Sequence, residues 1–163
     1  VMNCAGWGFS SAVFLSFYSG SDIKLINDIV VGLNGFTTNV IDTDFPIGYK
    51  RMLFRQAKYV IAMRFHSVLF SLYYATPFIA ISYSGKTSSI MKENGISDHM
   101  VEFGIRSNQF FYKEFDLDQG VLEDKVNESI DSKDYKAKLI NVSRSLKECA
   151  SEGFVKLFKL LDE

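Results

Sequence analysis

The chain has 163 residues, enough for one domain or slightly more, and its formal net charge at pH 7 is −1. Apolar residues make up 47% of it and aromatic residues 15%, which supports a substantial core and excludes a wholly disordered chain. The near-neutral charge argues against the basic surface that nucleic-acid binding requires. The apolar runs fall far short of the roughly 20 residues that a membrane-spanning helix needs.

Short apolar runs alternate with helical periods along the first part of the chain. This alternation predicts a parallel, doubly wound α/β sheet of Rossmann-like architecture, with right-handed crossovers. A strand that is apolar on both faces, at 59–63, is expected to be central. The expected strands cover 12–18, 37–41, 59–63, 78–83 and 110–115, and the expected helices cover 22–33, 46–57, 67–75 and 86–94.

The composition changes near residue 113. Residues 1–112 hold 16 charged and 20 aromatic side chains, whereas residues 113–163 hold 21 charged and only four aromatic ones. We therefore expect a Rossmann-like domain over 1–116 and one or two C-terminal helices over 117–163 that pack on it. An apolar stripe at steps of four and three is predicted to be a docking face, and its members are Tyr135, Leu139, Val142, Leu146 and Cys149.

Cysteine and histidine are scarce. The two cysteines, Cys4 and Cys149, form no C-x-x-C pair, so we expect no structural zinc and no other metal. This usage fits a reducing, cytoplasmic location. Of the two histidines, His99 follows a helix and is expected to be a solvated loop residue. The basic residues Lys50, Arg51, Arg55 and Lys58 are expected to form a solvated face.

The sequence R-F-H-S at 64–67 follows the predicted strand at 59–63 and opens a helix. In a parallel sheet, ligands bind beyond the carboxyl ends of the strands, and helix N-termini favour anions. The guanidinium of Arg64 fits a carboxylate or a phosphate, and His66 could transfer a proton. The alternative is structural: Arg64 in a salt bridge and His66 as a helix cap.

The sequence S-G-K-T-S-S at 84–89 begins the next helix. It ends like a phosphate-binding P-loop, but Ala80 stands where the first glycine is needed and lies inside a strand, which excludes an NTPase. Gly85 permits close approach to the backbone, and Lys86 offers a positive charge. This segment is either a second anion contact or an ordinary helix cap.

Two stretches together resemble a known family, the polysaccharide pyruvyl transferases. They are Y-V-I-A-M-R-F-H-S at 59–67 and T-P-F-I-A-I-S-Y-S-G-K at 76–86. They match the family's V-I-x-x-R-x-H strand end and its x-P-x-I-A-I-x-Y-x-x-K segment, at the right separation. The likeness is weaker but consistent over about 12–103.

The resemblance implies an enzyme with a GT-B fold of two Rossmann-type domains. Such an enzyme moves the pyruvyl group of phosphoenolpyruvate onto sugar hydroxyls of a bacterial surface polysaccharide, without a cofactor. It implies donor binding by Arg64 and His66. We expect His66 to be the catalytic residue, and we place Ser67, Gly85 and Lys86 in the same donor site. Lys86 matches the lysine that closes the motif.

Whole members of the family are about twice as long as this chain. The resemblance is therefore to the C-terminal, donor-binding domain, and implies a partner in an N-terminal domain that binds the saccharide acceptor. It also implies a cytoplasmic location, including the inner membrane face. Two other readings stay open: a GT-B glycosyltransferase or epimerase that uses a nucleotide sugar, and a non-catalytic α/β interaction domain.

Overall fold

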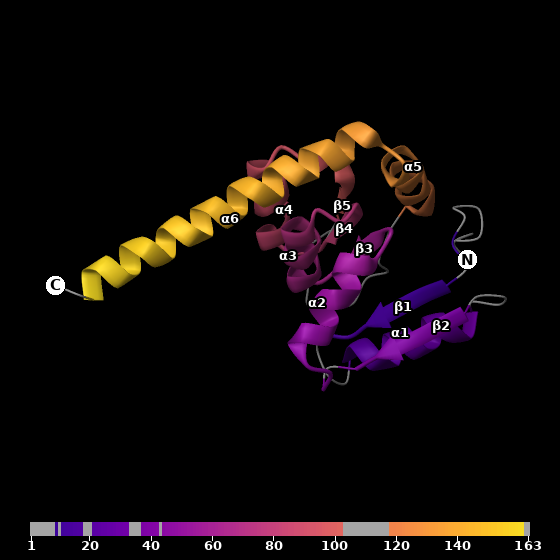
Figure 1. Ribbon diagram of the computed structural model, residues 1–163. Coiled ribbons are helices and arrows are strands. Elements are labelled where there is room, and N and C mark those ends of the chain that lie inside the picture. The colour runs from indigo at the N-terminus through magenta and orange to yellow at the C-terminus, as the bar shows by residue number, and fades with distance from the viewer. Residues whose placement is uncertain are drawn as a thin grey trace, which may run out of the picture. The chain divides into compact units, whose positions relative to one another are not determined.

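The computed structural model describes residues 9, 11–17, 21–32, 37–42, 44–102 and 118–161 (Figure 1). They form a mixed α/β structure with parallel strands, which confirms the predicted Rossmann-like class. The chain divides into two compact units, Val1–Leu53 and Phe54–Glu163, which we describe one at a time. The expected domain boundary at 116/117 lies among residues outside the described ranges and stays a prediction.

The first unit contains a parallel two-stranded sheet. Strand β1 (Ser11–Leu15) pairs with β2 (Thr37–Ile41), and helix α1 (Ser21–Gly32) connects them. Helix α2 (Ile47–Gln56) begins directly after Pro46, whose carbonyl accepts the N–H groups of Tyr49 and Lys50. This is the position at which the missing N–H of a proline is harmless.

Lys50 departs from the solvated basic face that the sequence predicts. Its side chain is buried, its Nζ donates to the carbonyl oxygen of Ser16 at 3.1 Å, and it lies 5.4 Å from the ring centre of Phe17. Arg51, Arg55 and Lys58 are exposed as expected. The prediction for Lys50 is wrong because α2 turns this position inward, where a carbonyl and an aromatic face receive the ammonium group.

The second unit is built on a parallel sheet with the order β3-β4-β5. Its strands are β3 (Val60–Ala62), β4 (Phe78–Ser82) and β5 (Met100–Glu102). All five residues of β4 are buried, so β4 is the central strand of this sheet. The prediction that 59–63 would be central is wrong here, because Ile61 of β3 is 43% exposed. The strand predicted at 110–115 lies outside the described residues.

Two crossover helices connect these strands. Helix α3 (Phe65–Tyr74) lies between β3 and β4, and helix α4 (Gly85–Glu93), followed by the 3₁₀ turn Ser97–His99, lies between β4 and β5. The sequence places both helices within two residues of their observed starts. It does not predict β5, since three residues are too few to show a strand period.

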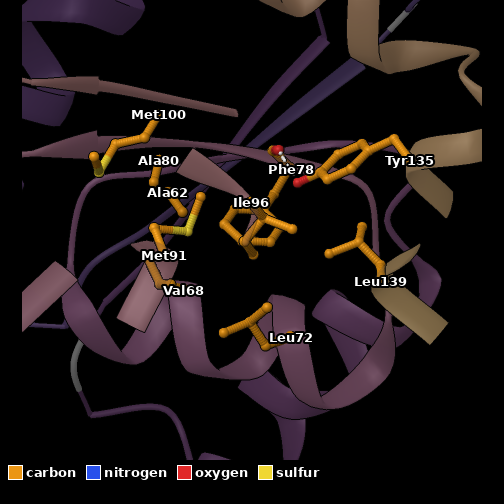
Figure 2. Close-up of a cluster of buried hydrophobic side chains, with 10 residues drawn as sticks. All are labelled: Ala62, Val68, Leu72, Phe78, Ala80, Met91, Ile96, Met100, Tyr135 and Leu139. Carbon is orange, nitrogen blue, oxygen red and sulfur yellow. Dashed lines mark hydrogen bonds between the residues drawn. The ribbon is translucent and has the colours of Figure 1, made fainter. Parts of the chain in front are cut away.

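The core of this unit lies between the sheet, α3, α4 and the C-terminal helix α6 (Lys133–Leu161) (Figure 2). The hydroxyl of Tyr135 donates to the carbonyl oxygen of Phe78 at 2.7 Å, and Leu139 is fully buried. Val142 and Leu146 pack against the same cluster. Most of the predicted docking stripe therefore covers the core of its own unit, whereas Cys149 is an exposed free thiol. The buried members are Ala62, Val68, Leu72, Phe78, Ala80, Met91, Ile96, Met100, Tyr135 and Leu139.

Helix α5 (Gln119–Ile130) packs against β4 and β5 and buries Leu122 and Val126. Its N-cap is Asp118, whose carboxylate accepts the N–H of Val121 at 3.2 Å. Among the described ranges, no helix combines the length and the apolar character that a bilayer crossing demands.

Candidate functional site

The candidate residues lie at the carboxyl edge of the second sheet. Strands β3 and β4 run parallel, with Ala62 opposite Ala80, so the residues that follow each strand emerge at the same edge. Helix α3 starts there after β3, and α4 starts there after β4. The structure therefore brings the first turns of two helices to one sheet edge, as the ligand-binding edge of a parallel α/β sheet requires.

Arg64 is the N-cap of α3. Its backbone is extended (φ −85°, ψ 142°), and no side chain caps the helix. The carbonyl oxygen of Arg64 accepts the N–H groups of Ser67 and Val68 and also the hydroxyl of Ser67, at 2.5 Å. Ser67 is buried, and its hydroxyl fixes the turn that presents Arg64.

Helix α4 begins in a similar way. Its N-cap is Ser84, with an extended backbone and no side-chain cap. The buried Ser82 holds this turn, because its Oγ donates to the carbonyl oxygen of Ser84 at 3.0 Å and bonds to Oγ of Ser88 at 2.9 Å. Gly85 and Lys86 are exposed in the first turn, and a Cβ atom on Gly85 would meet nothing within 4 Å.

Both starts are electropositive. The first N–H groups of a helix lack intrahelical partners and carry the positive end of the helix dipole. Arg64 and Lys86 add two cationic side chains, and the segments 63–67 and 83–89 contain no Asp or Glu. His66, exposed in the first turn of α3, lies at the same edge. The arrangement is suited to a ligand with more than one negative group.

Tyr83 connects the two helix starts and was not singled out from the sequence. Nη1 of Arg64 donates to its hydroxyl oxygen at 2.9 Å, and Cζ of Arg64 lies 5.9 Å from its ring centre. The sequence feature that could have identified Tyr83 is its position between the end of β4 and the N-cap of α4, inside the motif at 76–86. The contact itself depends on the pairing of β3 with β4, which the sequence does not state.

His99 lies apart from this edge, in the 3₁₀ turn before β5. Its ring stacks on Tyr135, with the ring centres 3.4 Å apart. Burial lowers the pKa of His99 to about 4; Asp98 opposes this effect, and Lys125 and Lys138 add to it. The expectation of a solvated loop histidine is met only in part: His99 is half-buried, because α6 places Tyr135 over the imidazole.

Metal ligands do not gather at any point of the described chain: no group of three or more His, Cys, Asp or Glu side chains could hold an ion there.

These elements define the class of the protein: a parallel, Rossmann-like α/β protein. Basic residues lie at the N-termini of two helices, at the carboxyl edge of the sheet. The model of the polysaccharide pyruvyl transferase family matches residues 13–85, which confirms the resemblance carried by the motif. The matched segment includes Arg64, His66, Ser67 and Gly85 and ends one residue before Lys86. No curated protein and no solved structure matches the chain.

Proposed function

We propose that this chain is the donor-binding part of a polysaccharide pyruvyl transferase. Its donor would be phosphoenolpyruvate, and its acceptor a pair of hydroxyls on a sugar of a bacterial surface polysaccharide. The observation that carries the proposal is Arg64 at the start of α3, in the family-matched segment, beside the uncapped start of α4.

Phosphoenolpyruvate carries a phosphate and a carboxylate on the same carbon, C2, so it needs two anion contacts close together. Arg64 would bind one group through its planar fork. Lys86 and the backbone N–H of Gly85 would bind at the start of α4, where the open space beside Gly85 admits a ligand. Ser67 would act through the turn that it fixes.

The reaction turns an enol phosphate into a ketal. C3 of phosphoenolpyruvate gains a proton, and one sugar hydroxyl oxygen bonds to C2. The bond from C2 to the phosphate oxygen breaks, the phosphate leaves, and the second hydroxyl oxygen bonds to C2. The two sugar hydroxyls lose two protons in all. This number equals the one proton gained by C3 and the one proton taken up by the released phosphate.

His66 is the proposed proton carrier in this sequence. It is exposed in the first turn of α3, two residues from Arg64, so a donor held by Arg64 would lie within its reach. An imidazole nitrogen can give or take a proton, which suits transfer to C3 or from a sugar hydroxyl. The acceptor would bind on a second Rossmann-type domain in a GT-B arrangement.

Calorimetric titration of the 163-residue chain with phosphoenolpyruvate tests the donor site. Arg64→Ala should weaken binding about 10- to 100-fold, because it removes a charge-assisted hydrogen bond. Lys92→Ala is the matched control: it removes an exposed cation at the other end of α4, which pairs with Glu102 at 3.7 Å, and should leave Kd unchanged.

Two outcomes would contradict the proposal. One is a chain that does not bind phosphoenolpyruvate, and the other is binding that Arg64→Ala leaves intact. A competition arm separates the main alternative: if a uridine nucleotide displaces phosphoenolpyruvate, or binds where phosphoenolpyruvate does not, the site belongs to a nucleotide-sugar enzyme.

A further inference from the structure

We infer that Tyr83 is a positioning residue of the donor site: it holds the Arg64 guanidinium between the starts of α3 and α4. The inference rests on the proposed function for the identity of the ligand. Its geometric basis is the bond from Nη1 of Arg64 to the hydroxyl of Tyr83 at 2.9 Å. A tyrosine hydroxyl can donate a hydrogen bond to a second group while its oxygen accepts the hydrogen bond from Arg64.

Three rigid features hold Tyr83 in place. It directly follows β4, whose five residues are all buried, and directly precedes Ser84, the N-cap of α4. The bonds of the Ser82 hydroxyl to the Ser84 carbonyl oxygen and to Ser88 brace the turn on both sides of Tyr83. These features hold the backbone of Tyr83 at the sheet edge, and the bond to Arg64 positions its hydroxyl there.

Tyr83 restricts Arg64 through two contacts. Arg64 has a long side chain with several rotatable bonds, and it is half-buried. The hydroxyl of Tyr83 accepts one N–H, and the guanidinium carbon lies 5.9 Å from the centre of its ring. Both contacts restrict the guanidinium before a ligand arrives, which reduces the entropy that binding would otherwise cost.

The contact also couples the two halves of the motif. Arg64 follows β3 and Tyr83 follows β4, so their bond fixes the first turn of α3 relative to the first turn of α4. A ligand with two anionic groups would need this spacing to reach both helix starts at once. The loss of the hydroxyl should therefore weaken binding of phosphoenolpyruvate more than binding of inorganic phosphate, which needs only one contact.

The test is a double-mutant cycle by calorimetry, with phosphoenolpyruvate and inorganic phosphate as separate probes. Tyr83→Phe keeps the ring and removes the hydroxyl. Arg64→Lys keeps the positive charge and removes the planar guanidinium group with its several N–H donors. We expect Tyr83→Phe to weaken phosphoenolpyruvate binding about five-fold in the wild-type background and less than about two-fold in the Arg64→Lys background. Inorganic phosphate should change less than phosphoenolpyruvate.

Tyr73→Phe is the matched control. Tyr73 is an exposed tyrosine of similar accessibility (44% against 38% for Tyr83), but it lies at the far end of α3. This variant should bind phosphoenolpyruvate like the wild type. Thermal unfolding of each variant shows whether a loss of affinity reflects a loss of folding.

The outcomes separate this inference from the proposed function. If the wild type binds phosphoenolpyruvate and Arg64→Ala abolishes it, but Tyr83→Phe binds normally, only the role of Tyr83 is refuted. An equal loss from Tyr83→Phe in both backgrounds also refutes it, because the residue would then act independently of Arg64. If the wild type binds no phosphoenolpyruvate, both fail.

Discussion

Two ionisable side chains are withdrawn from water further than their residue types usually are: Lys50 is buried, and His99 is half-buried. Lys50 is 4% exposed and donates to the Ser16 carbonyl oxygen, and His99 lies stacked on Tyr135. In each case a neighbour that is distant in sequence, 34 residues from Lys50 and 36 from His99, creates the environment. Residue type predicts the average exposure, and only the fold predicts the exception.

His99 should make stability depend on pH. Its pKa falls from 6.5 to about 4 because burial disfavours the charged ring. Below pH 6.5 the unfolded chain binds a proton that the folded chain does not, so the stability present above pH 6.5 is lost as the pH falls towards 4. Urea unfolding between about pH 7.5 and about pH 5 should show a smaller decrease for His99→Phe than for the wild type. Parallel decreases in both proteins would contradict this assignment.

Helices α3 and α4 end with the same backbone arrangement. After α3, the N–H of Ala75 bonds to the Leu72 carbonyl and that of Thr76 to the Ser71 carbonyl. After α4, Gly95 and Ile96 bond in the same pattern to Lys92 and Met91. The turning residue is left-handed in both, with φ 53° at Ala75 and 65° at Gly95. Glycine suits this conformation and alanine does not.

Exchanging these two residue types should change stability in opposite directions. Ala75→Gly should raise the free energy of unfolding by about 0.5–1 kcal/mol, because it relieves the left-handed strain, and Gly95→Ala should lower it by about 1 kcal/mol. A Cβ at Gly95 would meet only ordinary contacts with Lys138, so the expected cost lies in the backbone. Denaturant unfolding measures both, and a destabilised Ala75→Gly variant would refute the strain argument.

Helix α6 contributes to the core through one face. Leu139 is fully buried, whereas its neighbour Ile140 is 45% exposed. Leu139→Ala should cost about 2–4 kcal/mol through lost burial and a residual cavity. Ile140→Ala removes a similar volume from the surface and should cost less than about 0.5 kcal/mol. Comparable losses in denaturant unfolding would show that α6 does not pack as described.

At the scale of the whole molecule, the family-matched segment runs through both compact units, but the proposed donor residues all lie in the second. The two units also differ in how they bury their strands. Strand β4 is fully buried between two partners, whereas β1 and β2 pair with each other and keep exposed positions. The scaffold under the proposed site is thus the better-buried of the two.

Hydrogen exchange should show this difference. We expect the amides of β4 to exchange at least about ten-fold more slowly than those of β1 and β2, since protection follows burial and the free energy of local opening. Exchange measured by mass spectrometry on peptides from each strand tests this directly. Similar protection in both sheets would mean that the units open together.

The pattern of residues predicted most of the fold near the site. The strands at 60–62 and 78–82 and the helices that follow them lie close to the predicted ranges, because long apolar periods and the breaks at Thr76-Pro77 and Gly95 are local signals. Strand β5 was missed, because three residues give no period. Arg64 was found from its place after a strand, whereas Tyr83 needed the pairing of β3 with β4.

The sequence by itself determined the α/β class, the basic residues at two strand ends and the family motif. These depend on residue types and spacings along the chain, which are local properties. The tertiary structure decided that β4 is central, that Lys50 is buried and His99 half-buried, that most of the α6 stripe covers its own core, and that Tyr83 contacts Arg64. Each of these joins residues that are distant in the chain, and such pairings are set by packing.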